Sequence, residues 1–144
     1  MLILGCGNSD RADDAAGLLV ARKLREMGIE AREHTGDTLA LIEAWGGAPE
    51  VVVIDTTVSG GTPGRIRSWD GRQVRFAAAE FRCSSHALGV AEAVELARVL
   101  GRLPAKLTIY GIEGARFDRG GSPSPEVAGA ADRLAEQIAH AMGR

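Results

Sequence analysis

The apolar run Val51–Ile54 constrains the fold of this chain more than any other segment. Consecutive β-branched residues favour a strand, and a strand that is apolar on both faces is typical of a parallel sheet covered by helices on both sides. Strand-length apolar runs alternate with longer helical patterns along the rest of the chain. We therefore predict an α/β fold of three layers (αβα), with a central, mostly parallel, twisted sheet of about five strands.

The remaining elements follow from apolar periodicity and from helix and turn signals. We expect strands at Leu2–Cys6, Ile29–His34 and Leu107–Tyr110, and helices at Asp14–Met27, Thr38–Trp45, His86–Leu100 and Pro125–Met142. The alternating segment Arg65–Trp69 meets Asp70-Gly71, which predicts a hairpin at the sheet edge with Gln73–Phe76 as its second strand.

Length and composition narrow the class of protein. A chain of 144 residues with 45% hydrophobic content suits one domain, residues 1–144, and we expect a monomer. The net charge of −2 argues against binding to nucleic acid or to anionic membranes. Two cysteines, Cys6 and Cys83, are too few for a disulfide framework, and the N-terminal Met1–Gly5 lacks the long apolar core of a signal peptide. We therefore expect a cytoplasmic protein.

Three potential metal ligands follow the ends of predicted strands. Asp14 lies at the entrance of the first helix, Asp55 directly follows the central apolar run, and His86 begins a helix. Because the carboxyl ends of parallel strands share one edge of a sheet, we expect the three side chains to converge. Two carboxylates and an imidazole predict a hydrolytic metal site, and this ligand set fits nickel, zinc or manganese without choosing among them.

Neighbouring acidic residues allow other interpretations. The glycine turn Gly5–Asn8 before a helix resembles a dinucleotide-binding loop, but the third glycine of that motif is absent. Three aspartates, Asp10, Asp13 and Asp14, would also repel a phosphate. Taken alone, Asp13 is best interpreted as a helix cap, and Asp37, which lies near the same edge, as a turn residue rather than a substrate contact.

Nucleophilic catalysis is a weaker alternative. Ser84 and Ser85 precede His86, but a Ser/His pair requires spatial convergence and an orienting acid, and helix capping explains both serines better. Cys83 and His86 are three residues apart, and no cysteine-protease signature surrounds them.

Five motifs spread along nearly the whole chain carry a resemblance to a known family. They are Gly5-Cys6-Gly7-Asn8 with Asp13-Asp14 and Gly17, Asp55 with Pro63-Gly64, Ser85-His86 with Leu88-Gly89, Tyr110–Glu113, and Ser124–Val127. In order and spacing they resemble the hydrogenase maturation endopeptidases, which process nickel-iron hydrogenases. The resemblance implies a nickel-dependent endopeptidase of the aspartic or metallo type that removes the C-terminal extension of a nickel-loaded large-subunit precursor.

The same resemblance implies that Asp14, Asp55 and His86 are the catalytic and metal-binding positions. Nickel would be supplied by the precursor, and zinc or cadmium could occupy the same ligands. The resemblance does not decide whether nickel activates water or only docks the enzyme. Two departures stand out: Ala15 follows Asp14 where the family usually has glycine, and the glycine-rich turn after the second strand is altered to Thr35–Thr38. Relatives also often carry glutamate in place of Asp14.

One loop is a candidate for substrate contact, and two other functions remain alternatives to the endopeptidase. The long loop Ile112–Ser124 is expected to contact the precursor, so Arg116→Glu should weaken precursor binding. A noncatalytic nickel-sensing chaperone would bind the precursor without truncating it. A nucleotide-binding module would instead be stabilised against heat by its nucleotide.

Overall fold

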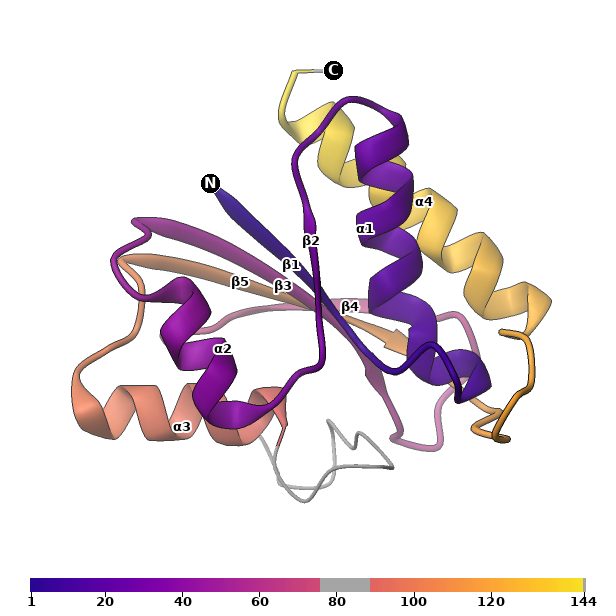
Figure 1. The fold of residues 1–144 in the computed structure, drawn as a ribbon, viewed down its shortest axis with the longest axis horizontal. Coiled ribbons are helices and arrows are strands. Elements are labelled where there is room, and N and C mark those ends of the chain that lie inside the picture. Colours follow the sequence, from indigo (N-terminus) through magenta and orange to yellow (C-terminus); the bar gives the residue numbers. More distant parts are fainter. Residues whose placement is uncertain (76–88, 144) are drawn as a thin grey trace.

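A central sheet with helices on both faces organises the computed structural model, which describes residues 1–75 and 89–143 (Figure 1). The elements, in chain order, are β1 (Leu2–Cys6), the 3₁₀ helix η1 (Ala12–Ala15), α1 (Ala16–Glu26), β2 (Arg32–His34), α2 (Thr38–Trp45), β3 (Glu50–Thr57), β4 (Ile66–Asp70), α3 (Val90–Leu100), β5 (Lys106–Glu113) and α4 (Pro125–Ala141).

The five strands lie in the order β2-β1-β3-β5-β4. All neighbouring pairs are parallel except β4 with β5, which is antiparallel at one edge. β3 occupies the centre and is buried from Val51 to Thr57, so the apolar run is a central strand as predicted. The α/β class and the mostly parallel sheet are confirmed.

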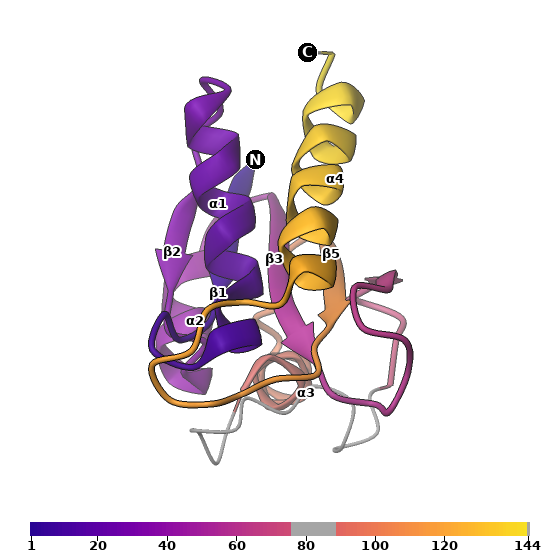
Figure 2. The same cartoon turned by 90° about the vertical axis from the view of Figure 1, so that its right-hand side faces the viewer.

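The two faces of the sheet bury separate apolar clusters. Helices α1 and α4 lie side by side on one face, and α2 and α3 cover the other (Figures 1 and 2). Successive residues of β3 point to opposite clusters, because side chains alternate along a strand. Val52 and Ile54 pack under α1 and α4, whereas Val51 and Val53 pack under α2 and α3.

The predicted hairpin after β4 is wrong. The partner of β4 is β5, and the N–H groups of Gln73 and Val74 both donate to the Asp70 carbonyl oxygen, at 3.1 and 3.0 Å, which makes residues 71–73 a turn. Phe76, the last residue of the predicted strand, lies outside the described residues. The Asp-Gly signal therefore marked a real turn, but long-range pairing with β5 decided the partner of the strand.

The order in which successive strands are added to the sheet changes direction between β1 and β3. From β1 it passes through α1 on one face to β2, and from β2 it returns through α2 on the other face to β3. Such a switch point leaves a crevice at the carboxyl ends of β1 and β3, where open α/β sheets bind ligands.

In the described part of the chain, no helix combines the length and apolar character required to cross a membrane.

Candidate active site

Glycines determine how closely η1 and α1 approach the carboxyl ends of β1 and β3. A Cβ atom on Gly17 would fall against the backbone oxygens of Cys6 and Ile54, and one on Gly5 would fall against the Gly17 oxygen. A Cβ on Gly7 would collide with the Asp14 carbonyl oxygen. Only residues without a side chain permit this packing. It brings Asp14 to the switch point.

Asp14 is fully buried in η1. Two backbone hydrogen bonds fix its position: the Asn8 N–H donates to the Asp14 carbonyl oxygen at 3.0 Å, and the Asp14 N–H donates to the Arg11 oxygen at 3.0 Å. The segment after β1 therefore folds back on itself and presents Asp14 from a rigid turn.

Asp55 lies near the carboxyl end of β3 and is 2% exposed. Its Oδ1 accepts a hydrogen bond from the Thr56 N–H at 2.7 Å. Burial raises the pKa of the Asp55 carboxyl well above its ordinary value, the Thr56 hydrogen bond opposes this, and the nearby charge of Asp14 raises the pKa further. Asp14 and Asp55 are therefore close enough to repel each other, which is an arrangement that a divalent cation would stabilise.

A side-chain hydrogen bond joins the two segments that carry these aspartates. The Thr56 Oγ1 hydroxyl, next to Asp55, donates to the carbonyl oxygen of Asp13, next to Asp14, at 2.9 Å. Both groups are buried, so the bond is shielded from water. It fixes the distance between the β3 and η1 segments without using either candidate ligand.

Asp13 caps no helix, so that interpretation of the sequence is wrong. Its carboxylate instead holds the loop between β5 and α4, which passes beneath η1 (Figure 2). Its Oδ2 accepts from the Ala115 and Arg116 N–H groups, both at 2.9 Å, and from the Ser124 hydroxyl at 3.1 Å; its Oδ1 accepts from the Ser124 N–H at 2.6 Å. Burial alone would raise the pKa of Asp13, but these hydrogen bonds outweigh burial and leave the pKa lowered.

Glu113 is a fourth buried carboxylate, and no role was predicted for it from the sequence. It ends β5, and its oxygens accept from the Thr57 hydroxyl and from the Ser59 hydroxyl and N–H, each at 2.8 Å. Burial raises its pKa, whereas these hydrogen bonds and the charge of Arg67 lower it, and the net shift is downward. The signal for it was present, because Glu113 ends an apolar strand just as Asp55 follows one.

Of the other predicted site residues, the structure describes Asp37 but not the segment that contains His86. His86, Cys83, Ser84 and Ser85 lie outside the described residues. Asp37 begins α2 as its N-cap, and its Oδ2 accepts from the Ala40 N–H at 3.1 Å. Within residues 1–75 and 89–143, no three His, Cys, Asp or Glu side chains are grouped closely enough to hold a metal ion.

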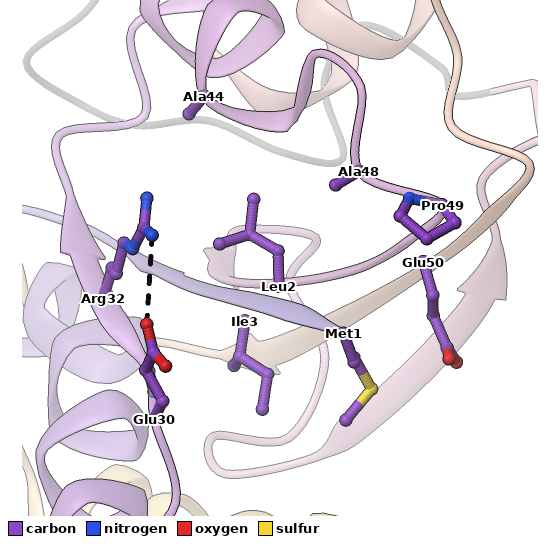
Figure 3. A pocket seen from close by; sticks show the side chains of 10 residues that line it. Met1, Leu2, Ile3, Glu30, Arg32, Ala44, Ala48, Pro49 and Glu50 are labelled. Carbon is purple, nitrogen blue, oxygen red and sulfur yellow. Dashed lines mark ion pairs between the residues drawn. The ribbon is translucent and has the colours of Figure 1, made fainter.

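A cavity at the opposite, amino edge of the sheet lacks comparable chemistry (Figure 3). It has a volume of about 330 Å³ and lies between the starts of β1, β2 and β3 and the end of α2. Both of its carboxylates are ion-paired: Glu30 with Arg32 at 3.9 Å and Glu50 with Lys106 at 3.4 Å. The buried and mutually repelling carboxylates at the carboxyl edge are therefore the better candidate for catalysis.

Comparison of the sequence with known proteins identifies related chains. Residues 35–141 match the model of the hydrogenase maturation protease family. The hydrogenase expression/formation protein HupD of Rhodobacter capsulatus is 28% identical over 145 residues, which cover 96% of this chain and 69% of that protein. HupD of Thiocapsa roseopersicina is 30% identical over 134 residues, covering 88% of this chain and 60% of its own length.

Solved structures agree with this match. The [NiFe] hydrogenase maturation protease HybD from Thermococcus kodakarensis superposes with a TM-score of 0.76 at 28% identity, covering 99% of this chain and 98% of its own. The hydrogenase maturating endopeptidase HybD from E. coli has the same fold, with a TM-score of 0.78 at 21% identity and coverage of 98% and 90%.

Proposed function

This chain belongs to the hydrogenase maturation protease family, and we propose that Asp14, Asp55 and His86 form its catalytic metal-binding site. As a member it is a hydrogenase maturation endopeptidase, a hydrolase that processes the C-terminus of a hydrogenase large subunit. One observation carries the site assignment: two buried carboxylates, Asp14 and Asp55, lie close together at the switch point of the sheet.

The proposed substrate is a large-subunit precursor that carries nickel and ends in a C-terminal extension. Recognition of the nickel by this site would make cleavage follow metal insertion. We place the reaction in the cytoplasm and the active protein as a monomer. Zinc or cadmium would bind the same ligands.

The donor chemistry suits such a cation. Carboxylate oxygens and an imidazole nitrogen are ligands for nickel and zinc. In the described part of the chain, Oδ1 of Asp55 accepts the Thr56 N–H, whereas Oδ2 accepts no hydrogen bond. That second oxygen is therefore available to a cation.

The side chains of the protein divide the remaining tasks. Asp14, Asp55 and His86 would hold the cation, and the Thr56 N–H orients the Asp55 carboxylate. Burial and the charge of Asp14 raise the pKa of Asp55, and a cation held by its oxygens would favour the deprotonated carboxylate. A cation held there supplies Lewis-acid polarisation of the scissile carbonyl or of a water molecule.

Processing by variants tests the assignment. Asp14→Asn, Asp55→Asn and His86→Ala should each lower the cleavage rate of nickel-loaded precursor more than about 100-fold. Loss of a residue that only supports a metal ligand costs up to about 100-fold, and loss of a ligand itself should cost more. His140→Ala, at an exposed position in the last turn of α4, is the matched control and should cleave normally. Folded variants that cleave at the rate of wild type would remove the metal-site proposal. Wild type that binds the precursor without cleaving it would indicate a chaperone.

A further inference from the structure

A pocket lies beside the site at the carboxyl edge of the sheet. It has a volume of about 420 Å³ and is lined by Asn8, Asp10, Arg11, Arg119 and Gly120. We call it the arginine pocket. It adjoins the segment that carries Asp14, because the carbonyl oxygen of Arg11 accepts the Asp14 N–H at 3.0 Å.

Two distant segments of the chain meet to form the arginine pocket. The Gly120 N–H donates to the Asp10 carbonyl oxygen at 2.6 Å, which places Arg119 beside Arg11. The Asp13 carboxylate holds the same loop at Ala115, Arg116 and Ser124. The backbone that carries both arginines is therefore fixed before any ligand arrives, which lowers the entropic cost of binding.

The two positive charges of the arginine pocket are not neutralised by the described residues. Within residues 1–75 and 89–143, no carboxylate oxygen lies within 4.0 Å of the Arg11 or Arg119 guanidinium. Asp10 lines the pocket but forms no ion pair there, and the Nε of Arg11 is buried without a hydrogen-bond partner. Arginine remains charged at all physiological pH values, so the pocket attracts an anion.

We propose that the arginine pocket binds a carboxylate of the precursor's C-terminal extension and so positions the scissile bond at Asp14 and Asp55. This inference rests on the proposed function, which brings that extension to this edge of the sheet. The guanidinium group matches a carboxylate by two parallel N–H···O bonds. On a peptide, such a carboxylate is either the terminal α-carboxylate or an Asp or Glu side chain.

Steady-state processing of nickel-loaded precursor by Arg11→Gln and Arg119→Gln tests the inference. Each variant should raise KM by about 10-fold or more with little change in kcat, since charge-assisted hydrogen bonds to the bound extension are lost. Arg119→Lys should recover part of the loss, because it keeps the charge but not the planar geometry. Arg102→Gln, an exposed arginine between α3 and β5, is the control for removing one charge and should keep the wild-type KM.

Two modified precursors identify the carboxylate. One carries an amidated C-terminus and the other has amides in place of the acidic side chains of the extension. The modification that removes the bound carboxylate should raise KM for wild type and abolish the difference from Arg119→Gln.

Two results would overturn the inference. If wild type cleaves while Arg11→Gln and Arg119→Gln keep its KM, or if neither modified precursor changes that KM, the arginine pocket does not bind the extension and the proposed function stands. If wild type fails to cleave loaded precursor at all, the proposed function fails first and takes this inference with it.

Discussion

Replacing Asp13 by asparagine should destabilise the protein far more than its single lost charge suggests. The buried carboxylate accepts three backbone N–H groups on two oxygens, and asparagine offers only one oxygen. If that oxygen faces Ala115 and Arg116, the asparagine amide donors face the Ser124 N–H, which is left buried and unsatisfied. One unsatisfied donor costs about 1–3 kcal/mol, and two hydrogen bonds to a charged acceptor each weaken by about 1 kcal/mol when it becomes neutral.

The expected loss in unfolding free energy for Asp13→Asn is therefore about 3–5 kcal/mol. Urea unfolding followed by circular dichroism measures it, as a lower midpoint with an unchanged m-value. Asp10→Asn removes a charge from the same segment at an exposed position and should stay within about 0.5 kcal/mol of wild type. A loss below about 1 kcal/mol for Asp13→Asn would refute the role assigned to these hydrogen bonds.

Three further variants test how the fold presents the site. Gly17→Ala should lower the unfolding free energy by about 3 kcal/mol or more, because its Cβ meets backbone oxygens. Gly129→Ala, on the open side of α4, should be neutral or stabilising when both variants are compared by thermal unfolding. Glu113 has a lowered pKa, so the stability it provides is present above its unfolded pKa and is lost as pH falls through the folded value. In urea titrations at successively lower pH, starting above the ordinary carboxyl pKa, Glu113→Gln should therefore lose less stability than wild type. Asp37→Ala removes the N-cap of α2 and should lower the unfolding free energy by about 1 kcal/mol.

Local patterns in the sequence were sufficient for much of the fold. The continuous apolar run of β3 requires cover on both faces, and this identified the central strand and the layered architecture. The same reasoning placed Asp14 and Asp55 at one edge, since each follows or ends a parallel strand. The pairing of β4 was not local: its partner, β5, begins 36 residues after β4 ends, and nothing in the segment 66–76 encodes that choice.

The chemistry around the candidate ligands depended still more on distant contacts. Asp13 follows the usual rule for a helix cap in sequence, yet its hydrogen-bond partners Ala115, Arg116 and Ser124 lie more than 100 residues away. The Thr56 bond to the Asp13 backbone spans 43 residues. Such bonds form only when the sheet brings separate loops to one edge, so a pattern read along the chain does not reveal them.

Whether this protein is a nickel-dependent processing enzyme is tested by the mass of the large-subunit precursor after incubation with the purified protein. Nickel-loaded and nickel-free precursor from the same genome are each mixed with wild type and with His86→Ala. A nickel-dependent endopeptidase with this site should remove a C-terminal peptide only from loaded precursor and only as wild type. An unchanged mass in every mixture, or equal cleavage of nickel-free precursor, would contradict this expectation.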